Sequence, residues 1–171
     1  MAYAEQHGWA VLPVHSVRDG RCSCGKPECG SPGKHPRTLN GVKDASSDRA
    51  QIEHWWKRWP DANIGIATGQ VSGVVAVDID GPGGESALVE LCGNPPTLTS
   101  KTAKGRHLIF ASPTLPVPNA VRLRPSLDIR GDGGYFVAPP SQHVSGICYR
   151  WLDEVGLGLD LPPAQLPPSL L

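Results

Sequence analysis

Val74-Val75-Ala76-Val77-Asp78-Ile79-Asp80 is an apolar run that ends in two aspartates, one residue apart. Such a run predicts a buried strand, and side chains at positions i and i+2 of a strand point to the same face. Asp78 and Asp80 would therefore stand side by side, and carboxylates that close repel each other unless a cation lies between them. Their hard oxygen atoms suit Mg²⁺ or Mn²⁺. The alternative is an ordinary strand end that leads into the turn Gly81-Pro82-Gly83-Gly84.

Two later segments add a histidine and a third carboxylate. His107 begins a predicted strand, directly after a basic, glycine-containing loop. Asp128 lies within another apolar strand pattern, whereas Asp132 lies between glycines and is predicted to be a turn residue. Three acids and a histidine at strand ends suit metal–triphosphate chemistry. On the residues alone, His107 is equally well explained as a structural histidine and Asp128 as a turn residue.

Basic side chains accompany these residues. Lys101, Lys104 and Arg106 lie in the loop before His107, where they either bind phosphates or form a solvated loop. Lys104 and Arg106 alternate with a glycine and would share one face of an extended loop. Arg130 shares a strand face with Asp128 and either pairs with it, the simpler reading, or reaches a phosphate.

A cysteine cluster predicts a second metal site. Cys22, Cys24, Cys29 and His35 have the spacing C-x-C-x₄-C-x₅-H, and three thiolates with one imidazole suit tetrahedral Zn²⁺. Because C-x-C is less common than C-x-x-C, His15 is an alternative fourth ligand. A structural zinc loop is favoured over disulfides or free thiols in a reducing compartment. The remaining cysteines, Cys92 and Cys148, are predicted to be ordinary, partly buried thiols.

Composition limits the class of protein. The 171 residues suffice for one domain with a core, and 20 Gly with 18 Pro indicate many turns and long loops. Lys+Arg and Asp+Glu are both 16, which argues against tight autonomous binding of nucleic acid. The first 45 residues are nevertheless basic. With no signal peptide, transmembrane run or lipidation motif, a cytoplasmic location is expected.

The order of predicted elements indicates an α+β fold, with a mixed or antiparallel sheet flanked by helices and a zinc-binding loop inserted over residues 18–44. Ile52, Trp55, Trp56 and Trp59 recur at helical spacing, and packing on the sheet is favoured over base stacking. Helices are predicted over 2–9, 49–59 and 84–92. Strands are predicted over 10–14, 63–68, 73–80, 97–99, 107–111, 127–130, 135–138 and 147–151.

The order of the candidate site motifs along the chain resembles that of the archaeo-eukaryotic primase superfamily. The resemblance is greatest to the bifunctional DNA primase/polymerase (prim-pol) domain at the N-terminus of phage and plasmid replication proteins. The shared order is D-x-D, a basic loop ending in His, and Asp between apolar residues, here Asp78, Asp80, His107 and Asp128. Further collinear segments are Gly33-Lys34-His35-Pro36, Gly41-Val42-Lys43-Asp44-Ala45, residues 59–69, Ser72-Gly73 and residues 133–141. Together they span most of the chain.

The resemblance implies an open, partly RRM-like sheet with its active site in a cleft on the sheet. It implies template-dependent nucleotidyl transfer with two Mg²⁺ or Mn²⁺ ions held by Asp78, Asp80 and Asp128, and with His107 on the phosphates of the nucleotide. It makes Lys43 and Ser141 candidate nucleotide contacts; a solvated loop and a Pro-Pro turn explain them as well. The implied partners are a DNA template and primer, dNTPs with NTPs as a further option, and a downstream helicase or helical module.

The expected organisation is a catalytic domain over 1–155 and a Pro/Leu-rich linker or tail over 156–171, in a longer protein of the host cytoplasm if phage-encoded. Three other functions stay open. A metal-dependent nuclease or phosphodiesterase would use the same acids, and a non-catalytic, zinc-stabilised module would only bind nucleic acid. A polymerase lacking a downstream helical module would extend primers without starting them.

Overall fold

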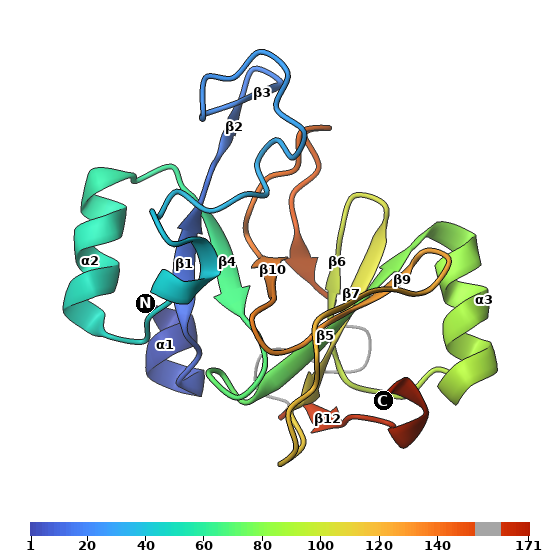
Figure 1. Ribbon diagram of the computed structural model, residues 1–171. Coiled ribbons are helices and arrows are strands. Elements are labelled where there is room, and N and C mark those ends of the chain that lie inside the picture. Colours follow the sequence, from blue (N-terminus) through green and yellow to red (C-terminus); the bar gives the residue numbers. More distant parts are fainter. Residues whose placement is uncertain (153–161) are drawn as a thin grey trace. The chain divides into compact units, whose positions relative to one another are not determined.

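The structure, a computed structural model, describes residues 1–152 and 162–171 (Figure 1). The chain forms two compact units: the first contains Met1–Ala67 and Tyr135–Arg150, the second Thr68–Gly134 and Trp151–Leu171. Each unit has its own, mainly antiparallel sheet. The mixed α/β class with antiparallel sheets and few helices therefore agrees with the sequence prediction, while an RRM-like arrangement stays a prediction.

Strand β5 (Val74–Asp80) is central to the second unit because its apolar residues are buried on both faces. It pairs antiparallel with β7 (Gly105–Ala111) on one side and with β9 (Leu127–Arg130) on the other. The strand order is β11–β6–β7–β5–β9–β8, and β12 pairs parallel with β7. The other strands are β6 (Leu98–Lys101), β8 (Ala120–Arg124), β11 (Arg150–Trp151) and β12 (Ala164–Gln165).

One face of this sheet packs against helix α3 (Gly81–Cys92), which lies beside β9 in Figure 1. Alternate residues of the central strands form a buried cluster with Leu88 of α3. The strand members of the cluster are Val75, Val77, Ile79, Leu108, Phe110, Leu127 and Ile129. The intervening residues, Asp78 among them, consequently point to the opposite face.

Helix α3 begins earlier than the sequence predicted. Gly81-Pro82-Gly83-Gly84 was expected to be a turn that opens the strand end to solvent, but these residues form the first turn of the helix. Pro82 is tolerated there because the first N–H groups of a helix have no partner within it. Gly84 lets α3 approach the sheet, since a Cβ at this position would overlap the carbonyl oxygen of Ser126.

The first unit is built on a three-stranded antiparallel sheet of order β1–β4–β10. Its strands are β1 (Val11–Val14), β4 (Asn63–Ala67) and β10 (Tyr135–Ala138). Helix α1 (Ala2–His7) is shorter than predicted because Gly8 adopts the left-handed conformation, with φ of 68°, that ends a helix.

Helix α2 (Arg49–Arg58) begins where the sequence predicted. The Asp48 carboxylate accepts a hydrogen bond of 2.8 Å from the N–H of Gln51 and so caps the helix. Ile52 and Trp55 are buried, which confirms that this face packs inward. Between β1 and α2 lie a small hairpin, β2 (Val17–Arg18) with β3 (Arg21–Cys22), and a 3₁₀ turn, η1 (Gly41–Asp44).

The described part of the predicted linker, residues 162–171, forms β12 and a 3₁₀ turn, η2 (Pro168–Leu170). Leu166 and Leu170 are buried in the same cluster as Leu88. Residues 153–161 of that prediction lie outside the described residues, and the boundary at 155 stays a prediction. Within residues 1–152 and 162–171, no helix combines the length and apolarity that a membrane span requires.

The approach of α3 to the sheet can be tested with neighbouring glycines. We expect Gly84→Ala to lower the free energy of unfolding by about 1–3 kcal/mol, because the added methyl group must displace the Ser126 backbone. Gly83→Ala should be neutral or stabilising by up to about 1 kcal/mol, because its nearest neighbour is a side-chain atom 3.8 Å away. Urea denaturation measures both, and equal stability of the two variants would contradict the close approach.

Candidate active site and metal centre

Four side chains from neighbouring strands form a row on the face of the second unit's sheet that carries Asp78. The register pairs Ser100 of β6 with His107 of β7, His107 with Asp78 of β5, and Asp78 with Asp128 of β9. Residues directly opposite each other on antiparallel strands project to the same face. The sheet therefore brings together His107, Asp78 and Asp128, three residues predicted from separate sequence motifs.

Ser100 and Asp78 hold the His107 ring from both sides. Ser100 is fully buried, and its hydroxyl oxygen lies 3.3 Å from Nδ1 of His107. Nε2 of His107 lies 3.4 Å from Oδ1 of Asp78. An ionised carboxylate only accepts hydrogen bonds, so we assign the proton of the neutral ring to Nε2 and let Ser100 donate to Nδ1. The row thus favours one ring orientation and one tautomer.

Arg130 supplies the positive charge of the row. Its Nη2 lies 2.7 Å from Oδ2 of Asp128 and 3.6 Å from Oδ2 of Asp78. All three side chains are about one-quarter exposed, at 22–26%, so water screens their interaction only in part. The ion pair with Asp128 that the sequence suggested is present, and the same guanidinium also reaches Asp78.

Asp80 is placed differently from Asp78. It lies at the end of β5, opposite Gly105, and its side chain is exposed. The alternation of the strand puts it on the face of Asp78, as predicted. Among the described residues, the ligand atoms of the three aspartates do not form a group within 4.8 Å of one another; only the cysteine cluster does. Their joint role as metal ligands stays a prediction.

Asp132 has the structural role that the sequence predicted for it. Its carboxylate accepts hydrogen bonds from the N–H groups of Gln70, at 2.9 Å, and Val117, at 2.8 Å. It therefore holds two loops of the second unit together.

Arg106 lies on the wrong face for the nucleotide role predicted from sequence. It is adjacent to His107 in β7 and so points to the opposite face of the sheet, toward α3. Its Nε and Nη2 donate to the two carboxylate oxygens of Glu85, at 2.9 and 2.7 Å, and Nη2 also donates to Asn94. This bidentate pair fixes the side chain as a link between β7 and α3.

The other predicted nucleotide contacts divide between the units. Lys104 is exposed in the turn between β6 and β7, where the Thr102 hydroxyl accepts from its N–H. Lys43 is exposed in η1 of the first unit. Ser141, also in the first unit, is buried, and its hydroxyl oxygen accepts a 2.8 Å hydrogen bond from the N–H of Ile64. Ser141 thus has a structural contact of its own.

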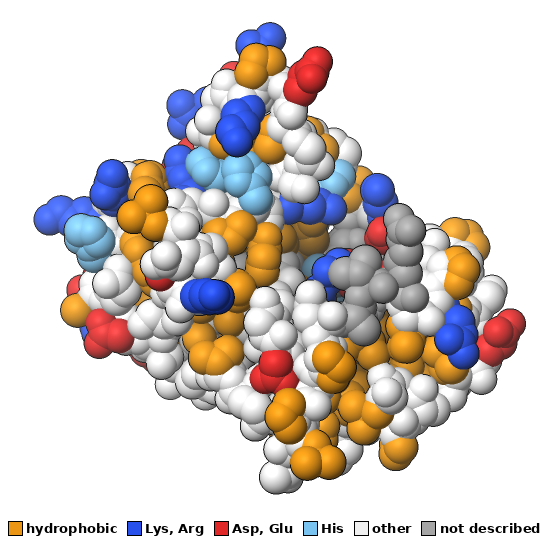
Figure 2. All heavy atoms as spheres, viewed as in Figure 1, with side chains coloured by type: hydrophobic (Ala, Val, Ile, Leu, Met, Phe, Trp, Pro, Cys, Tyr) orange, Lys and Arg blue, Asp and Glu red, His pale blue; other side chains and the backbone are white. Residues whose placement is uncertain are grey.

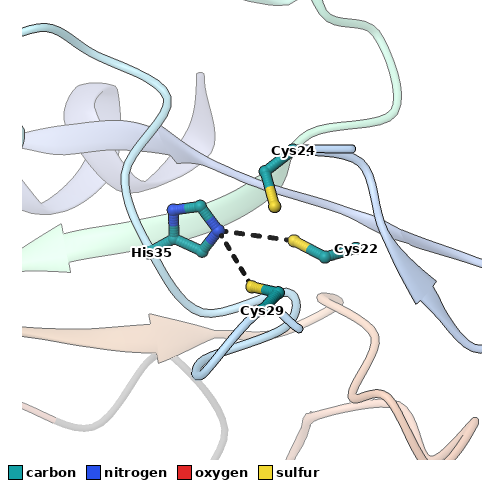
Figure 3. A group of neighbouring side chains, drawn as sticks. All are labelled: Cys22, Cys24, Cys29 and His35. Atoms are coloured by element: carbon teal, nitrogen blue, oxygen red, sulfur yellow. Dashed lines mark hydrogen bonds between the residues drawn. The ribbon is translucent and has the colours of Figure 1, made fainter. Parts of the chain in front are cut away.

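The predicted zinc ligands lie together in the first unit (Figure 3). Nε2 of His35 lies 3.4 Å from Sγ of both Cys22 and Cys29. With Cys24, the four ligand atoms all lie within 4.8 Å of one another. Cys22 ends the β2–β3 hairpin, and the loop that follows returns to bring in Cys29 and His35. This group can hold a metal ion.

The pKa values of the thiols show how strongly their charges interact. Burial raises the pKa of Cys22, but hydrogen bonds from the N–H groups of Gly33 and Cys24, and from the Cys24 and His35 side chains, bring it to about 6. The N–H of Ser31 lowers the pKa of Cys29, yet partial burial and the neighbouring Cys24 and Cys22 thiols leave it raised. A cation would relieve this competition between thiolates.

His15 lies beside the cluster and outside the ligand set. Its Nδ1 is 2.9 Å from the Ser23 hydroxyl, and its ring centroid is 4.4 Å from that of His35. Burial, followed by the charges of His35 and Arg37, lowers its pKa to about 4. The alternative in which His15 replaces a cysteine is therefore not the one the structure adopts.

The two remaining cysteines differ from each other. Cys92 is partly buried, as predicted, and burial raises its pKa. Cys148 was predicted to be partly buried but is exposed; it forms an isolated antiparallel bridge with Gln142 shortly before β11. All five cysteines are free thiols.

The sequence interpretation missed Ser100 as part of the row and Glu85 as the partner of Arg106. Ser100 directly precedes the basic loop, and nothing in the local sequence distinguishes it. Its alignment with His107 depends on the β6–β7 register, which a turn of unpredicted length determines. The only sequence signal for Glu85 was weak: it is an acid in the first turns of the helix that follows the strand of Asp78, where it could pair with a basic residue of a neighbouring strand.

The family described as "Bifunctional DNA primase/polymerase, N-terminal" matches residues 1–169 of the chain. A search of curated proteins finds no match.

The cysteine cluster makes a direct prediction about metal content. We expect one zinc per chain after dialysis, measured by elemental analysis, and a lower melting temperature after chelation, because structural zinc is part of the folding free energy. Cys22→Ala should abolish tight zinc binding, while Cys148→Ala, a matched exposed thiol, should keep it. A full complement of zinc in Cys22→Ala would contradict the assignment.

Proposed function

Because the chain belongs to the family of bifunctional DNA primase/polymerase N-terminal domains, we propose that it catalyses template-dependent nucleotidyl transfer, extending DNA from dNTPs. The observation that best supports this reaction is the row of His107, Asp78 and Asp128 on three neighbouring strands. The row joins carboxylate oxygens to an imidazole donor on one face, as phosphoryl chemistry requires. Phage or plasmid replication is the context we propose.

The carboxylates suit the divalent ions expected for this chemistry. Asp78 and Asp128 lie opposite each other and already share one cation, the guanidinium of Arg130. Asp78, Asp128 and the exposed Asp80 are the residues that would hold Mg²⁺ or Mn²⁺. When bound, two such ions would lower the pKa of the attacking 3′-hydroxyl and neutralise negative charge on the leaving pyrophosphate.

His107 acts in this proposal as a neutral donor to the triphosphate. Its Nε2–H, which faces Oδ1 of Asp78 at 3.4 Å, would exchange that contact for a phosphate oxygen, while the Ser100 hydroxyl at Nδ1 keeps the ring from turning. Arg130 contributes a second positive group. Its 3.6 Å contact with Asp78 is the weaker of its two contacts, so it can be exchanged for a phosphate oxygen while the 2.7 Å contact with Asp128 is kept.

The outer contacts of the nucleotide are less strongly supported. Lys104 keeps its proposed role because it is exposed in the turn that leads into β7, the strand of His107. Lys43 and Ser141 remain candidates through the family resemblance alone. We leave Arg106 out of the site because its guanidinium is bound to Glu85 on the other face.

We further propose that the cysteine cluster binds a structural zinc. Three cysteines and His35 fill a tetrahedral set and leave no position for a reactive water. A DNA primer–template, dNTPs with NTPs as alternatives, and a downstream helicase or helical module are the proposed partners.

Primer extension with Mg²⁺ or Mn²⁺ tests the reaction. Asp78→Asn should lower kcat more than about 100-fold, because the amide cannot replace the negative charge of the carboxylate. Asp48→Asn is the matched control: it removes an acid of equal size, and asparagine still caps α2. Wild-type activity in Asp78→Asn would refute the assignment.

The same assay separates the rival activities. Shortening of the primer instead of its extension would indicate a nuclease or phosphodiesterase built on these acids. DNA binding without either reaction, in wild type as in Asp78→Asn, would indicate a non-catalytic module.

Ser100 offers a test of how His107 is held. Ser100→Ala should lower kcat/KM for the nucleotide about three- to tenfold, the effect of losing one buried hydrogen bond. It should also change the Nε2-protonated tautomer population of His107, measured by ¹⁵N NMR. Ser86→Ala, an exposed serine of α3, should change neither quantity. An unchanged tautomer in Ser100→Ala would show that Ser100 does not orient the ring.

A further inference from the structure

A groove of about 670 Å³ runs along α2 in the first unit and has no part in the proposed chemistry. Its lining includes Trp55, Trp59 and Arg58 from α2 and its end, and Arg37 from the segment after the zinc loop. Figure 2 shows Lys and Arg side chains gathered over the β2–β3 hairpin and over the end of α2 that leads to β4. The chain is electrically neutral in total, but the lining of the groove has two arginines, Arg37 and Arg58, against one acid, Asp44.

Two guanidinium groups lie against the ring of Trp59. Cζ of Arg37 is 5.3 Å from the ring centroid, and Cζ of Arg58 is 4.9 Å from it. Arg37 is fixed, since its side chain is only 12% exposed and is paired with Asp61 at 3.3 Å. Arg58 is exposed, and within the described residues no acidic side chain forms an ion pair with it. The two arginines therefore differ in their freedom to move.

We propose that this groove binds single-stranded nucleic acid, the unpaired template strand, with a base stacked at Trp59 and a backbone phosphate on Arg58. This inference rests on the proposed function. Stacking of a base on tryptophan is generally stronger than an exposed cation–π contact. A base can therefore displace Arg58 from the ring, and the freed guanidinium can then pair with the adjacent phosphate.

The lining favours a nucleic acid over an apolar peptide. Besides the arginines, the lining is mostly polar: it includes the amide of Gln51, the amide of Asn40, which is bound to Asp44, and the hydroxyl of Thr38, which donates to the Gly41 carbonyl. Its acidic member, Asp44, already accepts two 2.9 Å hydrogen bonds from Asn40. An amphipathic helix would need apolar pockets. Trp55 is only 7% exposed, and Leu39, the exposed aliphatic residue of the lining, stands out into solvent instead of forming a pocket.

Fluorescence anisotropy with labelled oligo(dT) of about 15 nucleotides tests the groove on the full, zinc-loaded chain. Trp59→Ala should raise Kd roughly tenfold, and Trp59→Phe should keep most of the affinity. Arg58→Ala should raise Kd and reduce the slope of log Kobs against log salt by about 0.7. Lys57→Ala is the matched control, because it removes the same charge from the adjacent residue of α2 without touching the groove.

The outcomes separate this inference from the proposed function. Asp78→Asn should bind oligo(dT) like the wild type while failing to extend primers. Wild-type affinity in both Trp59→Ala and Arg58→Ala would overturn the proposal that the groove binds single-stranded nucleic acid. A loss of affinity in Lys57→Ala equal to that in Arg58→Ala would also overturn it. Absence of oligo(dT) binding by the wild type would also overturn it, and primer extension by the same preparation would leave the nucleotidyl transferase intact.

Discussion

The register of β5 between β7 and β9 is the constraint on which the second unit depends. Burial of Val75, Val77 and Ile79 against α3 fixes which face of β5 points inward. A slip of one residue would place Asp78 in that apolar cluster and expose Ile79, at the cost of both apolar burial and an uncompensated charge. The hydrophobic face therefore positions the polar row of Ser100, His107, Asp78 and Asp128 on the other face, although no apolar residue touches the chemistry.

The two carboxylates of the row repel each other, and this repulsion must be offset. Asp78 and Asp128 are direct cross-strand neighbours, and like charges in that position destabilise a sheet. Arg130, two residues along β9 from Asp128, offsets this repulsion, and Nε2 of His107 in β7 lies 3.4 Å from Oδ1 of Asp78. Arg130, Asp78 and Asp128 are each about one-quarter exposed, so water also reaches this group of charges.

Sequence reasoning succeeded where the determining contacts are local. The start of α2 at Arg49, the β5 strand and the cysteine cluster each depend on residues close in sequence, and the structure contains all three. It failed where a partner is distant. The pairing of Arg106 with Glu85, of β12 with β7, and of Ser100 with His107 depends on register and helix placement, which composition and periodicity do not encode. Residues 162–171 were predicted to be part of a linker or tail because they are rich in proline, but Leu166 and Leu170 are buried in the core.

The acid row and the cysteine cluster each bring several groups that can carry negative charge close together, and they differ in how that charge is offset. In the acid row the balancing cation belongs to the chain, and strands with a buried core hold the carboxylates in place. In the cysteine cluster, Cys22 ends β3, and the other three ligands lie on a loop in which residues 23–35 form no helix or strand. The lowered pKa of Cys22 beside the raised pKa of Cys29 shows that the protein alone accommodates one thiolate more easily than two. We expect a metal bound at this cluster to stabilise the loop, so that its removal loosens the loop while the sheet that carries Asp78 stays folded.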